Sequence, residues 1–158
     1  MKVKIKLNGG VMPKKQHEGD AAFDLYTPED VLVYDNRQII DMKFSIELPI
    51  GYAATIQPRS GFSAKGMEVE TLDEDGNPTL IRMDADVCRG LIDSNYRGSV
   101  GVIIKVHDLP TDQKFTIKKG TRIAQMQIVP VPEVDLVPAE ELSSTERDEN
   151  GFGSTGSI

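Results

Sequence analysis

Residues 89–102 read RGLIDSNYRGSVGV, and this stretch decides the fold that we expect. Apolar runs at 87–92 and 100–106 flank a short polar corner, and Asp, Ser, Asn and Gly between two such runs predict a β-hairpin. Three functional side chains lie within five positions of this corner: Asp93, Tyr96 and Arg97. A plain turn does not need this chemistry, so we expect the corner to belong to a functional site.

The rest of the chain repeats the same short-strand pattern. About ten alternating or β-branched runs are separated by turns, in keeping with 14 Gly and 9 Pro in 158 residues. Such a pattern predicts one all-β domain, either a sandwich, a jelly roll or a barrel. One helical turn is expected at Ser60–Lys65, with Ser60 as its N-cap.

Composition excludes several classes of function. A net charge of -7 argues against a general binder of nucleic acid or of anionic membranes, which need a basic surface. No run reaches the roughly 18 apolar residues of a membrane span. The N-terminus alternates lysine with apolar residues, which predicts an edge strand and not a signal peptide. The single cysteine, Cys88, cannot form an internal disulfide, so we expect a reducing, cytoplasmic location.

Residues 57–66, QPRSGFSAKG, form the second informative segment. A guanidinium (Arg59), a hydroxyl (Ser60) and backbone N–H groups made accessible by Gly61 could together cradle an anion. An ordinary loop with a helix cap explains the same residues equally well.

Three further segments have both a functional and a structural interpretation. Asp24 lies among apolar neighbours and needs a partner, for which an arginine in a structural salt bridge is the obvious choice. Gln125 lies in a strand-like run, and its amide can donate and accept, although it could simply be exposed. Residues 147–156, RDENGFGSTG, place an aromatic ring between glycines, as in a mobile lid or a frayed terminus. The sequence contains no zinc-ligand spacing, no Walker-type loop and no convincing Ser-His-Asp triad.

Taken in order, these five segments resemble the five motifs of the trimeric dUTPase family. The matching residues are 21–26, 58–61 with 65–66, 90–98, 120–125, and Arg147 with 151–156. One motif would be weak evidence, but five in order are specific, and they extend over nearly the whole chain.

The resemblance implies a fold and a reaction. The fold would be a jelly-roll-like β-barrel with a flexible C-terminal tail, assembled as a homotrimer whose three active sites each use all three subunits. The reaction would be dUTP + water → dUMP + pyrophosphate, with Mg²⁺ held by the triphosphate and not directly by the protein. It would limit uracil in DNA and supply dUMP for dTMP synthesis.

The resemblance also implies a role for each site residue. Asp93 would orient the water that attacks the α-phosphorus, and Tyr96 would pack on the deoxyribose and exclude a 2′-hydroxyl. The main chain from Val87 to Asp93 would read the uracil edge, including Val87, Gly90 and Ile92. Phosphates would be held by Arg59, Ser60, Gly61 and Gln125. Asp24 would support the metal–water shell or Arg59. The lid would comprise Phe152, stacked on uracil, and the phosphate-side residues Arg147, Gly153, Ser154 and Thr155.

Residues 1–142 are expected to form the barrel domain and residues 143–158 the lid. The distance from the second to the third motif is longer than compact members of the family need, which indicates an acidic hairpin insertion at about 68–85. The insertion could be a tolerated surface feature or a docking surface for a protein partner. Two alternative functions remain: a dCTP deaminase, which shares the fold, and a regulatory protein built on the dUTPase fold.

Overall fold

A computed structural model describes residues 1–146 and 148 of the chain. This part contains thirteen strands and one six-residue helix, so the all-β prediction is confirmed. The elements are β1 Lys4–Leu7, β2 Phe23–Tyr26, β3 Val31–Val33, β4 Arg37–Asp41, β5 Phe44–Glu47, β6 Tyr52–Gln57, α1 Ser60–Lys65, β7 Met67–Leu72, β8 Pro78–Met83, β9 Ala85–Val87, β10 Gly90–Ile92, β11 Gly101–Val106, β12 Phe115–Ile117 and β13 Arg122–Pro130.

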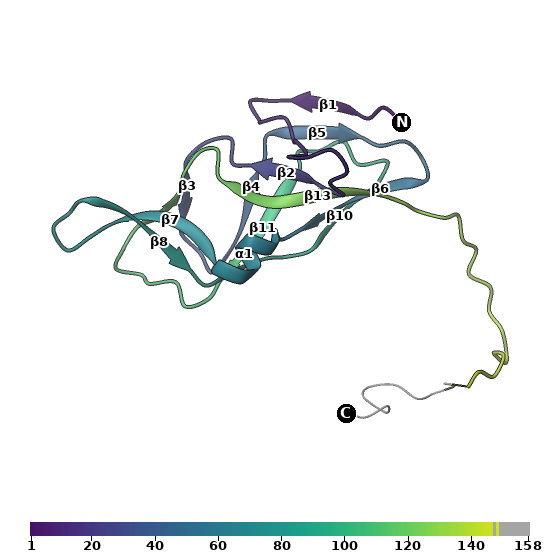
Figure 1. The fold of residues 1–158 in the computed structure, drawn as a ribbon. Coiled ribbons are helices and arrows are strands. Elements are labelled where there is room, and N and C mark those ends of the chain that lie inside the picture. The colour runs from purple at the N-terminus through teal and green to yellow at the C-terminus, as the bar shows by residue number, and fades with distance from the viewer. Residues whose placement is uncertain (147, 149–158) are drawn as a thin grey trace.

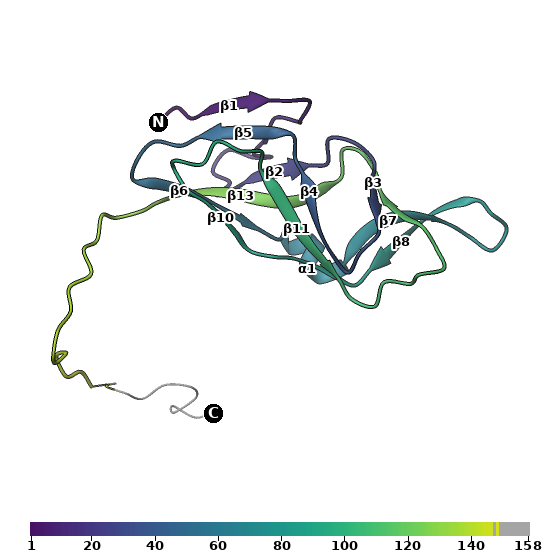
Figure 2. The same cartoon turned by 180° about the vertical axis from the view of Figure 1, so that it is seen from behind.

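The strands form four small antiparallel sheets. Their strand orders are β1-β5, β10-β6-β13-β2, β4-β11-β9 and β3-β12-β7-β8 (Figures 1 and 2). The predicted all-β fold class holds, but within residues 1–146 and 148 the ladders end at edge strands and the sheets are not closed into a barrel.

A single apolar core joins these sheets. The pattern on β11 alternates strictly, with Val102, Ile104 and Val106 buried and the residues between them partly exposed. Strand β6 lies between β10 and β13 and has four consecutive buried residues, 53–56, because both of its faces are covered. The ends of β6 therefore have fixed positions, and the functional segments adjoin those ends.

The predicted hairpin around residues 89–102 is only partly correct. Val87 pairs with Ile104 on β11, but three residues later Gly90 pairs with Ile56 on β6. Val87 and Ile92 are both buried although they are five positions apart, which one continuous strand would place on opposite faces. A break between β9 and β10 removes this conflict, so the polar corner connects strands of two different sheets.

The acidic insertion is a regular hairpin, β7–β8, that projects from the body in Figure 1. Its ladder runs from the pair Met67–Met83 to the pair Leu72–Pro78. Asp73 closes the tip because its carboxylate accepts backbone N–H bonds from Asp75 and Asn77, at 3.0 and 2.8 Å.

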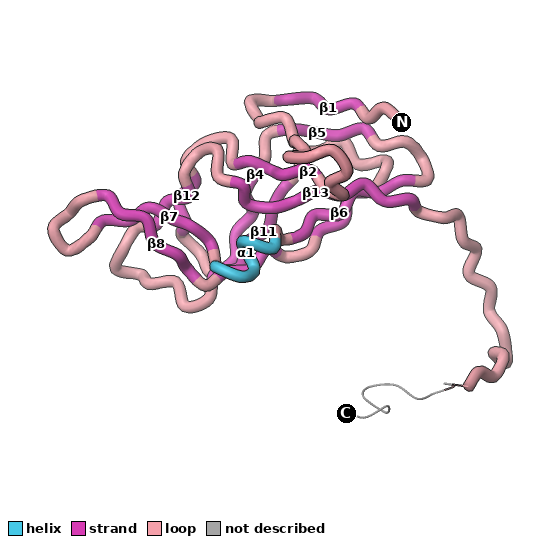
Figure 3. The backbone as a smooth tube through the Cα atoms, in the orientation of Figure 1, coloured by secondary structure: helices cyan, strands magenta, loops and turns pink. Residues whose placement is uncertain are grey.

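After β13 the chain leaves the sheets. Residues 131–146 are exposed throughout and run away from the body as an arm without regular secondary structure (Figure 3). No helix in the described part of the chain is long and apolar enough to cross a membrane.

Candidate active site

A buried carboxylate holds two arginines at one end of the β10-β6-β13-β2 sheet. Asp24 on β2 is 4% exposed. Its Oδ1 accepts a hydrogen bond from Arg59 Nε at 2.9 Å, and its Oδ2 lies 3.5 Å from Arg122 Nη1. The prediction of an arginine partner for Asp24 is thus confirmed. The second arginine, Arg122, was quoted in the fourth motif without a role, and only the pairing of β13 with β2 brings it to Asp24.

This arrangement leaves guanidinium groups available to an anion. The side chain of Arg59 is 24% exposed and that of Arg122 is 44% exposed, while the carboxylate between them is enclosed. A guanidinium has five N–H donors, so each arginine keeps donors that Asp24 does not use. Both carboxylate oxygens of Asp24 already face a cation, and two positive charges beside it would repel a metal–water shell. Of the two roles expected for Asp24, support of Arg59 is the one that this geometry fits.

Helix α1 begins directly after Arg59. The N-cap position is Arg59, in extended conformation, and no side chain caps the helix, so the expectation that Ser60 is the N-cap is wrong. Ser60 is instead the first helical residue, and its side chain is exposed. Gly61 is also exposed, with nothing within 4 Å of the position that a Cβ would take. Buried Phe62 anchors the turn, so the main chain at 60–61 faces solvent beside Arg59.

The polar corner presents Asp93 and Tyr96 at the surface. Asp93 is exposed, and its carbonyl accepts a hydrogen bond from the Tyr96 N–H at 3.1 Å. The phenol of Tyr96 donates to the Ser99 carbonyl at 3.0 Å. Arg97 Nη1 donates to the carbonyls of Ser94 and Tyr96 at 2.7 and 2.8 Å, so this guanidinium braces the turn. The carboxylate and the ring are the groups that remain for a ligand.

Two residues that sequence reasoning missed hold this corner in shape. A Cβ at Gly98 would lie 2.2 Å from the Tyr96 hydroxyl oxygen, so the ring can lie there only because residue 98 is glycine. Ser99 Oγ donates to Asp41 Oδ1, which also accepts the Lys43 N–H at 2.8 Å. The bond from Ser99, followed by that from Lys43, holds the pKa of the Asp41 carboxyl below its ordinary value. The bond between Ser99 and Asp41 joins residues 58 positions apart and has no local sequence signal. Gly98 lies only two positions from Tyr96, inside the third motif, but the sequence does not show that the ring lies against it.

Four of the predicted nucleoside-side residues meet in one place. Gly90, Ile92, Asp93 and Tyr96 line a cavity of about 220 Å³. Val87 is not among its lining residues: its side chain is buried in the core, and β9 pairs with β11.

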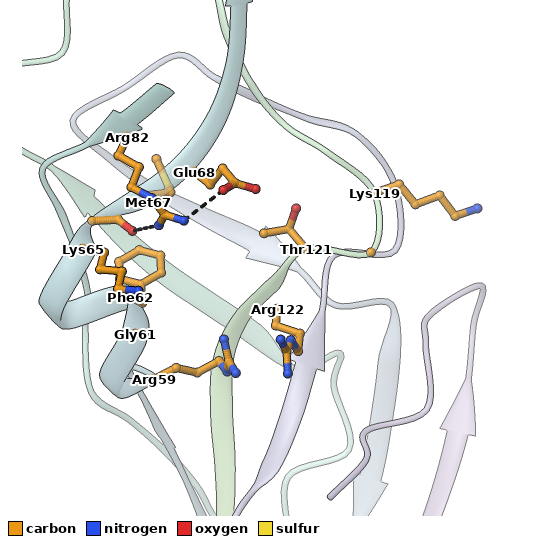
Figure 4. Close-up of a pocket in the computed structure, with 12 residues that line it drawn as sticks. Arg59, Gly61, Phe62, Lys65, Met67, Glu68, Arg82, Lys119, Thr121 and Arg122 are labelled. Carbon is orange, nitrogen blue, oxygen red and sulfur yellow. Dashed lines mark hydrogen bonds and ion pairs between the residues drawn. The ribbon is translucent and has the colours of Figure 1, made fainter. Parts of the chain in front are cut away.

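The predicted phosphate-side residues gather elsewhere. Arg59 and Gln125 line a cavity of about 370 Å³ together with Asp24 and Arg122. Arg59 and Gly61 also line a neighbouring cavity of about 530 Å³ (Figure 4). Asp93 lines neither of them.

The two groups of residues lie at opposite ends of the β6–β10 pair. Ile92, the neighbour of Asp93, pairs with Ala54, whereas Arg59 follows the far end of β6. At about 3.3 Å per residue, the corner and Arg59 are separated by roughly 15–20 Å along the strand. One chain therefore does not bring Asp93 to the phosphate-side residues.

The predicted lid residues Arg147, Phe152, Gly153, Ser154 and Thr155 lie outside the described residues. Among residues 1–146 and 148, no group of three or more His, Cys, Asp or Glu side chains is placed to hold a metal ion.

Comparison with known proteins identifies the family to which these residues belong. The family model described as dUTPase matches residues 9–83 and 80–156. The chain belongs to the dUTPase family. Two proteins named deoxyuridine 5'-triphosphate nucleotidohydrolase show its similarity to other members. The protein from Picosynechococcus sp. is 38% identical over 96% of each chain, and that from Nautilia profundicola is 39% identical over 99% of each chain.

Solved structures of dUTPases share the fold. The dUTPase of Staphylococcus bacteriophage 80alpha, determined with dUPNHPP, has 27% sequence identity and a TM-score of 0.77, with 98% of each chain covered. The resemblance drawn from the five motifs is confirmed at the level of family and fold.

Proposed function

We propose that this chain hydrolyses dUTP to dUMP and pyrophosphate, and thereby limits uracil in DNA and supplies dUMP for dTMP synthesis. The observation that carries the proposal is the shared cavity of Asp93, Tyr96, Gly90 and Ile92 in a member of the dUTPase family. An exposed carboxylate beside an aromatic ring suits a nucleotide enzyme that positions water next to a sugar.

In this mechanism Asp93 accepts a hydrogen bond from a water molecule and orients it in line with the α-phosphorus. The ring of Tyr96, held against Gly98, packs on the deoxyribose and leaves no room for a 2′-hydroxyl. The main chain near Gly90 and Ile92 reads the uracil edge, with Val87 contributing only main-chain groups because its side chain is buried. Phosphoryl transfer asks mainly for positioning and charge stabilisation, and a covalent nucleophile is not required.

In this proposal the phosphate groups are held by Arg59, Ser60, Gly61 and Gln125. We include Arg122 because it lies beside the same carboxylate as Arg59. Asp24 orients the guanidinium of Arg59. Mg²⁺ bound to the triphosphate would offset phosphate charge and polarise the α-phosphorus. The arginines around Asp24 favour a metal carried by substrate oxygens, because a protein-bound cation there would face two positive charges. Arg147, Phe152, Gly153, Ser154 and Thr155 close over the bound nucleotide in this proposal.

We further propose that the enzyme is a homotrimer whose sites lie between subunits. The separation of Asp93 from Arg59 supports this arrangement, since the phosphate-side residues of a neighbouring copy could face the corner. The arm at 131–146 supports it too, because Leu136 and Leu142 are at least 90% exposed in the single chain and would gain burial on another subunit.

The β7–β8 hairpin supports a second, additional role in binding a protein partner. Its tip combines three carboxylates, Asp73, Glu74 and Asp75, with exposed Leu72 and Leu80. Such a surface fits a basic partner with an apolar patch. A nucleic acid or membrane partner is not part of the proposal, given the net charge of -7. The proposal includes a cytoplasmic location, because Cys88 is a free thiol.

The test is to incubate the protein with each dNTP and Mg²⁺ and to measure pyrophosphate and ammonia. Pyrophosphate release from dUTP alone supports the proposal, whereas ammonia release from dCTP without pyrophosphate would replace it with a deaminase. Sedimentation of the same preparation should give the mass of a trimer, and an active monomer would contradict a shared site.

A further inference from the structure

A strongly basic cavity adjoins Arg59 in this acidic chain. Its volume is about 530 Å³, and Figure 4 shows its lining. Its lining includes one carboxylate, Glu68, and five cationic side chains: Arg59, Lys65, Arg82, Lys119 and Arg122. A local excess of positive charge on a chain with a net charge of -7 attracts anions selectively to this place.

The cationic side chains come from two walls. Arg59 and Arg122 form one wall and lie close together in Figure 4. The carboxylate of Asp24 holds both. Lys65 at the end of α1 and Arg82 on β8 belong to the other wall. Lys119 lies apart, with its side chain pointing away from the other labelled residues. The insertion hairpin therefore contributes a guanidinium, Arg82, next to the segment that is proposed to hold phosphates.

The base of the hairpin is fixed against α1. A Cβ at Gly66 would lie 2.3 Å from the Met83 carbonyl oxygen, and Gly66 has a φ of +77°, so both contact and conformation require glycine. Arg82 Nη1 donates to the Gly66 carbonyl at 3.3 Å. The turn between α1 and β7 thus sets the distance from Arg82 to Arg59, whatever the hairpin tip does.

The guanidinium of Arg82 is held by a bond that a phosphate could replace. Its Nη2 donates to Glu68 Oε2 at 3.0 Å, but the two side chains are 48% and 47% exposed. An exposed pair of this kind contributes little stability. A pyrophosphate group carries more negative charge than a carboxylate, and two of its oxygens can accept a guanidinium in bidentate geometry, so it competes well with Glu68.

We propose that Arg82 binds the pyrophosphate part of the substrate, with Lys65 beside it and with Glu68 holding the guanidinium in place until a phosphate oxygen replaces the carboxylate. This adds a wall from the insertion hairpin to the residues already assigned to the phosphates. Identifying the ligand as the pyrophosphate of dUTP rests on the proposed function. The cavity itself predicts binding of a pyrophosphate anion.

The experiment measures the affinity of the full chain for inorganic pyrophosphate by calorimetry at low ionic strength. R82Q should raise the Kd roughly tenfold or more, since a charge-assisted hydrogen bond is lost. R82K should recover part of the affinity, because lysine restores the positive charge but not the bidentate guanidinium. R37Q removes the same charge from an exposed arginine on β4 that lines neither cavity beside Arg59, so it is the matched control and should change the Kd little.

Glu68→Gln separates direct binding from simple bracing. If Arg82 contacts the anion, E68Q frees the guanidinium and should lower the Kd. If Arg82 only braces the α1–β7 turn through Glu68, E68Q and R82Q should weaken binding alike, and the proposal is overturned. The proposal is also overturned if R82Q has a normal thermal unfolding curve and binds pyrophosphate as tightly as R37Q does.

Turnover of dUTP by the unmodified protein is measured in parallel. If the unmodified protein hydrolyses dUTP and R82Q binds pyrophosphate with unchanged affinity, only the role of Arg82 is rejected. If R82Q weakens pyrophosphate binding but the unmodified protein does not hydrolyse dUTP, only the proposed function is rejected.

Discussion

Asp24 and Arg59 are 35 positions apart in the chain, yet Arg59 Nε lies 2.9 Å from Asp24 Oδ1. The pair joins the first and second motifs, because β13 lies between β2 and β6 and brings their ends together. Desolvating a carboxylate offsets much of its attraction to an arginine, so such a pair is weak evidence for stability. Its value here is orientation, since it directs a guanidinium that keeps free donors toward solvent.

Asp24→Asn should therefore weaken phosphate binding as well as lower the stability of the fold. Two guanidinium groups would lose their common counter-charge, and we expect KM for dUTP to rise roughly tenfold. The free energy of unfolding should fall by about 2 kcal/mol, less than for a fully buried pair, because both arginines reach water. Steady-state kinetics and urea unfolding measure the two effects.

Glu47→Gln is the matched control, as it breaks the surface pair with Lys4, whose side chain is 81% exposed. It should leave both quantities unchanged. An unchanged KM in the Asp24 variant would show that the pair has no part in substrate binding.

Asp93→Asn should abolish most turnover while substrate still binds. An amide cannot orient and activate water as a carboxylate does, so kcat should fall by about 10²–10⁴-fold. Single-turnover kinetics and calorimetry with a non-hydrolysable dUTP analogue separate the two effects. Asp75→Asn, at the hairpin tip, makes the same chemical change away from the cavity and should act as the unmodified enzyme. Near-normal turnover in the Asp93 variant would remove this residue from the mechanism.

Gly98→Ala should impair discrimination between dUTP and UTP. The new Cβ would lie 2.2 Å from the Tyr96 hydroxyl oxygen and 2.5 Å from Cζ, so the ring must move. We expect the ratio of kcat/KM for dUTP to that for UTP to fall roughly tenfold.

Tyr96→Phe tests the alternative that the hydroxyl matters and not the ring position. It removes the bond to the Ser99 carbonyl but keeps the ring, so selectivity should be largely retained. If Gly98→Ala leaves selectivity intact, the ring does not exclude the 2′-hydroxyl.

Asp41 gives a prediction on pH. Its folded-state pKa lies below its ordinary value of 3.8, first because of the Ser99 hydroxyl and then because of the Lys43 N–H. A carboxyl with a lowered pKa stabilises the fold above its unfolded-state pKa and loses this contribution as pH falls through the folded-state value. The unfolding free energy of Asp41→Asn should therefore lie below that of the unmodified protein near neutral pH, and the difference should shrink as pH falls below 3.8 and through the folded-state pKa.

Urea titrations at several pH values measure this difference. Ser99→Ala removes the larger cause and should reduce the same pH dependence. If the unfolding free energy depends on pH in the same way in the unmodified protein and in both variants, the Asp41–Ser99 bond does not contribute to stability.

Removing the tip of the β7–β8 hairpin should leave catalysis intact. Replacing residues 71–79 by Asn-Gly keeps the register of Glu70 with Leu80 and closes the hairpin with a two-residue turn. It also keeps Glu68 and Arg82, so kcat/KM should stay within about twofold. A large loss of activity would mean that the tip itself belongs to the site. Loss of a protein partner without loss of activity would support the docking role.

Much of the local structure was predictable from short-range pattern. The bounds of β2, β6, α1, β7 and β12 agree with the runs between turn residues, because alternation and turn chemistry act within a few positions. The need of Asp24 for an arginine was also predictable, since a carboxylate among apolar neighbours must be paired. Ser60 was not predictable as a first helical residue: its type favours an N-cap, but the extended conformation falls on Arg59.

The sequence by itself determined the strand positions, the family and the residue types of the site, because these depend on local composition and on the order of motifs. Tertiary structure alone decided which strands pair: Val87 pairs with β11, Gly90 pairs with β6, and Arg122 lies beside Asp24. Pairing is selected by competition among many apolar surfaces for one core, and no local pattern records that outcome. The same competition places Asp93 and Arg59 at opposite ends of β6.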